Sequence, residues 1–153
     1  MMEKGQDKLS YAWINEGYAK SDYDDASRNY DGDYYLVAKG YADSCDAYYG
    51  YAYNYFIEAK NFFEEAKRYA STNETLRLAE LYVNFTELGA KLDSEMHQAC
   101  EYFSSACNSY DQGFWETGNT QIEEMNEHIR EHDKLVTTYN DYLSKIRALL
   151  DTL

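Results

Sequence analysis

The apolar residues of the last third of the chain recur at heptad spacing. One row consists of Ile122, Ile129, Val136, Leu143 and Leu150. A second row, three residues further on, consists of Met125, His132, Tyr139, Ile146 and Leu153. Two such rows form one apolar stripe along a helix. The pattern predicts a long helix over residues 119–152 with a single core-facing side.

Small and aromatic residues alternate along the second quarter of the chain. The small row is Ala38, Cys45, Ala52, Ala59 and Ala66. Two aromatic-rich rows lie beside it, one through Tyr48 and Tyr55 and one through Tyr49 and Phe56. Small residues let a neighbouring helix approach, and rings fill the space beside them. We therefore interpret the aromatics as a helical core, with a surface that stacks sugars or bases as the alternative.

Turn signals separate four helical segments. Asp31-Gly32 is one such signal, the polar stretch 70–75 is a second, and the stretch 110–123 carries Gly113 and Gly118. Ser71 with Glu74 and Thr120 with Glu123 fit capping boxes. The expected helices cover about 6–30, 33–70, 73–112 and 119–152. Residues 1–5 are expected to be a disordered N-terminus ahead of a single domain, 6–153.

Short connections favour antiparallel neighbours. The fold class expected is therefore all-α, an elongated, coiled-coil-like antiparallel four-helix up-down bundle. The first helix is expected to be shorter than the others and to flank only the first part of the second. The bundle would then thin to three helices near residues 58–90. Apolar flanks left uncovered there would favour a homodimer.

Composition narrows the function further. The 153 residues include no Pro and three Cys, and the net charge is −14. Nucleic acid and anionic membrane surfaces need a basic partner, so neither is expected. No apolar run approaches the length of a membrane span, about 18 residues. An odd cysteine count without a CxxC motif predicts reduced thiols in a cytoplasmic protein.

The sequence carries no catalytic signature. Nucleotide-binding glycine motifs and the GxSxG motif are absent. The Glu-x-x-His pairs of di-iron bundles are also absent, because Ser94, Met125 and Ile129 stand three residues before the three histidines. We therefore expect a non-enzymatic protein without a cofactor.

One group of side chains could still bind a metal. His128 and His132 share a helix face, and folding the hairpins brings Cys45, His97, Cys100 and His132 to one level. Two thiolates and imidazoles would suit zinc or another transition metal. The competing interpretation makes His132 a polar residue that fixes helix register and Cys45 a small core residue.

Two functional hypotheses follow. The first is a protein-interaction scaffold or chaperone-like module, which binds a protein partner or a second copy of itself. Phe114 and Trp115, in the turn between two long helices, would be its anchor. The alternative is a small-molecule-binding or metal-binding sensor bundle with a site near Cys45, Cys100 and His132.

Overall fold

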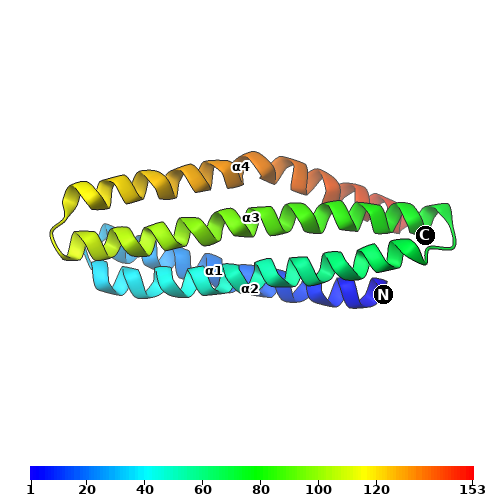
Figure 1. The fold of residues 1–153 in the computed structure, drawn as a ribbon, viewed down its shortest axis with the longest axis horizontal. Helices are drawn as coiled ribbons and strands as arrows, with labels where there is room; N and C mark the ends of the chain where they lie inside the picture. The colour runs from blue at the N-terminus through cyan, green and yellow to red at the C-terminus, as the bar shows by residue number, and fades with distance from the viewer.

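The computed structural model describes residues 1–153, which form four helices and no strand. These are α1 (Met2–Asp31), α2 (Tyr35–Arg68), α3 (Asn73–Asp111) and α4 (Trp115–Thr152). Consecutive helices run antiparallel along one long axis (Figure 1). The predicted all-α antiparallel bundle is confirmed, and α1 is the shortest helix at 30 residues. None of the four has a stretch apolar enough to cross a membrane.

Helix α1 reaches further than the sequence predicts. It begins at Met2 instead of near residue 6, so the segment expected to be disordered is its first turn. Gly5 lies against the ring of Phe63, and the Gln6 side chain donates to the Tyr82 hydroxyl at 3.2 Å. The expected thinning to three helices is therefore wrong. The polar residues near the N-terminus are typical of a disordered end, but Gly5 lets this turn pack closely on α2.

The helices pack in chain order, and one seam stays open at the backbone. Helix α1 packs on α2, α2 on α3, and α3 on α4, whereas α1 and α4 make no close backbone approach. Side chains bridge this seam: the indole N–H of Trp13 donates to the hydroxyl of Tyr139 at 3.0 Å. Helix α3 is buried on nearly every turn, while α4 buries only Gly118, Met125 and Ile146.

The two hairpin turns at one end of the bundle have the same geometry. The amide N–H of Tyr34 donates to a carbonyl five residues earlier, and that of Phe114 does the same, both at 2.8 Å. The residue before each has a positive φ, 64° at Asp33 and 81° at Gly113. The α1–α2 and α3–α4 turns thus share one backbone motif, offset by 80 residues. This turn starts α4 at residue 115 instead of 119.

A cluster of rings joins the two turns. Tyr30, Tyr35, Tyr110 and Trp115 lie with neighbouring ring centroids 5.3–6.1 Å apart. The Tyr110 ring also covers Gly118, where a side chain would clash. Gly118 is therefore a contact glycine inside α4 and not a helix breaker. Aromatic pairs in such tilted and edge-on arrangements stabilise beyond their buried area.

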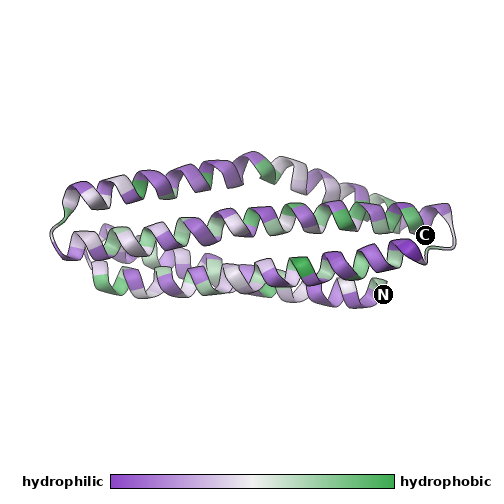
Figure 2. Ribbon diagram, in the orientation of Figure 1, coloured by the Kyte–Doolittle hydropathy of each residue, from purple (hydrophilic) through white to green (hydrophobic).

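The aromatic residues of α2 divide between core and flank. Tyr49, Phe56 and Phe63 are at most 3% exposed, which confirms a packed aromatic core. The row through Tyr48 and Tyr55 lies on the flank instead, where both rings contact tyrosines of α1. Apolar and polar residues alternate along each helix accordingly (Figure 2). Buried alanines lie between these rings on α2, and glycines of α1 and α3 face Phe63 and Phe56, so the helices approach closely.

The contact between Phe56 and Gly89 gives a test of this packing. A Cβ at Gly89 would overlap the Phe56 ring, whereas Gly40 faces open space within its helix. We expect Gly89→Ala to lower the free energy of unfolding by about 1–3 kcal/mol, through overpacking. Gly40→Ala, the matched control, should raise it by roughly 0.5–1 kcal/mol. Urea unfolding measures the free energy of unfolding of both variants. An equal increase in the two would show that α2 and α3 are not in close contact at Gly89.

Candidate functional site

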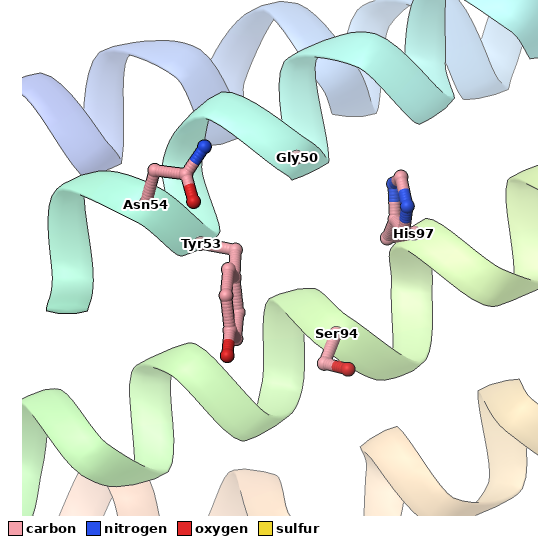
Figure 3. A pocket seen from close by; sticks show the side chains of 5 residues that line it. All are labelled: Gly50, Tyr53, Asn54, Ser94 and His97. Atoms are coloured by element: carbon pink, nitrogen blue, oxygen red, sulfur yellow. The ribbon is translucent and has the colours of Figure 1, made fainter.

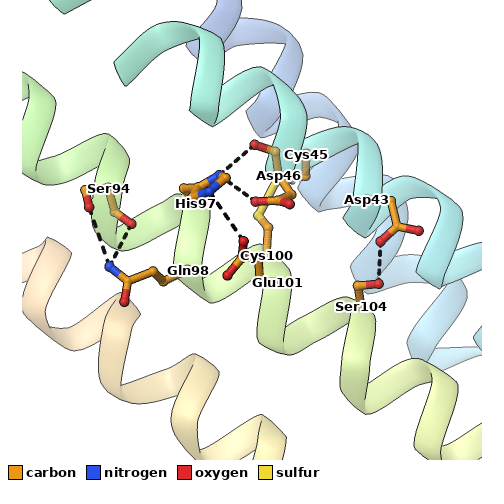
Figure 4. Close-up of polar contacts among 9 residues, drawn as sticks. All are labelled: Asp43, Cys45, Asp46, Ser94, His97, Gln98, Cys100, Glu101 and Ser104. Carbon is orange, nitrogen blue, oxygen red and sulfur yellow. Dashed lines mark hydrogen bonds and ion pairs between the residues drawn. A yellow bond between two sulfur atoms is a disulfide. The ribbon is translucent and has the colours of Figure 1, made fainter. Parts of the chain in front are cut away.

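Three potential metal ligands meet on the outer α2–α3 face at mid-length. His97 Nδ1 lies 2.5 Å from Asp46 Oδ1, and His97 Nε2 lies 3.4 Å from Glu101 Oε1. One ligand atom from each of the three residues lies within 4.8 Å of the others. Figure 4 shows the imidazole between the two carboxylates. The ring is also fixed by the backbone carbonyl of Asp46, which accepts from Nδ1 at 3.0 Å.

The two helices position these side chains by simple spacing. His97 and Glu101 are four residues apart on α3, so they share one face, and Asp46 comes from the facing turn of α2. The Oδ1 atom of Asp46 is buried. Burial raises the pKa of Asp46, with Glu101 and Asp43 adding to the rise and His97 opposing it. The site therefore holds more negative charge than the one imidazole can balance.

A disulfide lies directly behind the site. Cys45 and Cys100 are bonded, with Cα atoms 6.2 Å apart, and both are fully buried. They immediately precede Asp46 and Glu101, so the bond fixes α2 against α3 where the ligands arise (Figure 4). The sequence predicts reduced thiols, and for this pair that prediction is wrong. Both cysteines occupy core-facing positions at one level, whereas Cys107 is buried and unpaired.

A groove of about 300 Å³ adjoins His97. It is lined by Gly50, Tyr53, Asn54, Ser94 and His97. Figure 3 shows Tyr53 extending from α2 toward α3 beside Ser94. The imidazole lies 3.5 Å from where a Cβ on Gly50 would be, so a larger residue there would narrow the groove. A ligand at His97 would have open space on this side.

The five metal-ligand candidates named from the sequence do not form one site. Nδ1 of His128 lies 2.7 Å from Glu95 Oε2, and Nδ1 of His132 lies 3.0 Å from Asp133 Oδ1. Cys45 and Cys100 are bonded to each other. Only His97 joins a cluster.

Asp46 and Glu101 are the partners of His97, and the sequence analysis did not identify either of them. The register that places Cys45 level with Cys100 also places the residues that follow them at one level. That register was the signal that could have found both carboxylates.

A second surface feature is the aromatic end of the bundle. We use this name for five large side chains beside the two turns, each more than half exposed. They are Tyr34, Leu36, Val37, Phe114 and Trp115. The predicted anchor residues thus lie in a wider apolar group.

Comparison with known proteins finds no matching family model, no matching curated protein and no matching solved structure.

The disulfide should contribute strongly to stability. It closes a loop with a sequence separation of 55 residues. By chain entropy, such a loop is worth about 4 kcal/mol. Reducing the wild-type protein should therefore lower its free energy of unfolding by about 2–4 kcal/mol in urea. Cys45→Ala should not respond to reductant, and Cys107→Ala should respond like the wild type. If reductant does not change the urea unfolding curve of the wild type, the Cys45–Cys100 disulfide is contradicted.

Proposed function

We propose that this protein is a non-enzymatic helical bundle that binds one divalent transition-metal ion at Asp46, His97 and Glu101. The observation that carries the proposal is the convergence of one imidazole and two carboxylates from two helices within 4.8 Å. Such mixed nitrogen and oxygen ligands suit zinc and its neighbours. Three protein ligands would leave a further coordination position for water or a small molecule.

The electrostatics of the site support this proposal. Asp46 and Glu101 face each other across His97, with Asp43 close by. A divalent cation would relieve the repulsion among these carboxylates. We further propose a cytoplasmic setting, which the odd cysteine count without a CxxC motif favours and the Cys45–Cys100 bond does not. There the Cys45–Cys100 bond would depend on redox conditions, and metal binding with it.

Metal binding has a direct test with a matched control. The chelator-treated protein should bind one Zn²⁺ per chain, seen by native mass spectrometry and titration calorimetry. His97→Ala should weaken the affinity by roughly 10–100-fold, because even the loss of a supporting residue around a metal costs that much. His132→Ala removes an imidazole that has its own carboxylate partner and should bind Zn²⁺ like the wild type. The site is contradicted if the wild type binds no Zn²⁺, or if His97→Ala and His132→Ala lose the same amount of Zn²⁺ affinity.

The aromatic end supports a second candidate function, a protein-interaction scaffold that self-associates. Exposed apolar groups of this kind commonly mark contact surfaces. The chain carries a net charge of −14, which disfavours packing two bundles side by side. Contact end to end buries Phe114 and Trp115 while keeping the acidic flanks apart. The partner proposed is therefore a second copy of this chain.

Sedimentation velocity tests this second candidate. We expect a concentration-dependent dimer that becomes more stable as salt screens the acidic flanks. The double variant Phe114→Ser/Trp115→Ser should remain monomeric at every concentration. Tyr69→Ser, which alters an exposed ring at the other end, should dimerise normally. A wild type that stays monomeric throughout contradicts self-association.

A further inference from the structure

Two carboxyl groups meet inside the bundle, separate from the metal-site residues. Asp93 of α3 is 2% exposed, and the side chain of Glu16 of α1 is 17% exposed. Each carboxyl group shifts the pKa of the other, so the two side chains are neighbours. No protein N–H or O–H donates to Oδ2 of Asp93. A buried carboxylate oxygen without a donor is costly, so a proton between the two groups is the simplest way to satisfy it.

The surroundings offer little positive charge to the pair. Lys20 is the one base beside it, with Nζ 4.0 Å from Glu16 Oε2 and a side chain that is 67% exposed. The other titratable groups that face the pair or its tyrosines are Tyr23 and Asp24 of α1, Tyr49 of α2, and Asp133 and Tyr139 of α4. None of these can supply a positive charge. Two ionised carboxylates would therefore be poorly balanced.

The pair also lies near the seam between α1 and α4. Helices α1 and α4 make no close backbone approach, and the Trp13–Tyr139 hydrogen bond bridges them. Trp13 is three residues from Glu16 on α1, and its ring meets Phe85 edge-on at 6.3 Å. Burial raises the pKa of the Tyr139 hydroxyl, and the negative charges of Glu16 and Asp93 add to the rise. A charge change at the pair thus acts on the contacts that hold α1 to α3 and α4.

We propose that Glu16 and Asp93 form a proton-operated latch that holds α1 against α3 and α4 when both are protonated and loosens α1 when Glu16 ionises. The latch acts on the α1–α4 seam, because α1 remains packed along α2 in both states. Water would enter at the seam to solvate the ionised Glu16, and the Trp13–Tyr139 bridge would break.

The direction of the pH dependence follows from burial. Burial raises the pKa of Glu16 from its ordinary 4.5 to about 7, with Lys20 and a hydrogen bond from Asp93 opposing the rise. Burial and then Glu16 raise the pKa of Asp93. The unfolded chain therefore loses its proton from Glu16 at lower pH than the folded chain does. The stabilisation is full below pH 4.5 and is lost as the pH rises through about 7.

Trp13 can report this transition. The chain has two tryptophans, so Trp115→Phe leaves Trp13 as the sole tryptophan, which can be excited selectively in the presence of the 18 tyrosines. In that background, fluorescence should shift to longer wavelength with a midpoint near pH 7, as the ring becomes wetter. Glu16→Gln should remove the transition and keep the low-pH spectrum. Asp93→Asn leaves Glu16 buried and ionisable, so it should keep a transition with a shifted midpoint. Lys20→Met should raise the midpoint, because it removes the cation that favours ionised Glu16.

Histidine titration is the main competing explanation and has its own control. The triple variant His97→Gln/His128→Gln/His132→Gln should keep the transition if the latch causes it. Loss of the transition in this folded variant would overturn the proposal. A transition unchanged in Glu16→Gln would overturn it as well, and that variant decides alone if Asp93→Asn fails to fold.

Discussion

The close approach of α2 and α3 is the contact on which the rest of the structure depends. Alanines along α2 and the glycine at position 89 remove the side chains that would hold the two helices apart. The ring of Phe56 then fits against backbone, and Cys45 comes within bonding distance of Cys100. Helix α3 becomes the central element, which explains why it buries far more residues than α4. The His97 cluster exists because this same spacing brings Asp46 to Glu101.

The outer helices are held by different means. Helix α1 packs on α2 through alanines and tyrosines, whereas α4 packs on α3 and reaches α1 only through long side chains. The rings around Tyr30 and Tyr110 close one end firmly. Away from that end, the α1–α4 seam admits polar groups such as Glu16 and Asp93 without disrupting the fold. The bundle is thus closed by rings at one end, while along the rest of its length α1 and α4 are joined only by side chains.

The sequence predicts the fold better than it predicts the sites. Heptad rows in α2 and α4 identify the helices because burial repeats with the helical period. The sequence does not predict the start of α1, because Gly5 packs against Phe63 in its first turn and no local pattern reveals this contact. The sequence suggests that Gly118 breaks the helix, because its close contact with Tyr110 comes from another helix. Asp93 resembles an ordinary surface carboxylate, since its burial depends on how α1 is rotated.

A short connection, residues 69–72, joins the two hairpins, so two molecules could exchange a hairpin with each other. The two hairpins pack on each other through α2 and α3, and both chain ends lie at the end where this connection runs (Figure 1). If the connection straightened, the α3–α4 hairpin of one molecule could pack on the α1–α2 hairpin of another. Every interhelical contact would be regained in such a domain-swapped pair. The Cys45–Cys100 bond would then join two chains covalently, so oxidation would trap whichever form was present when it closed.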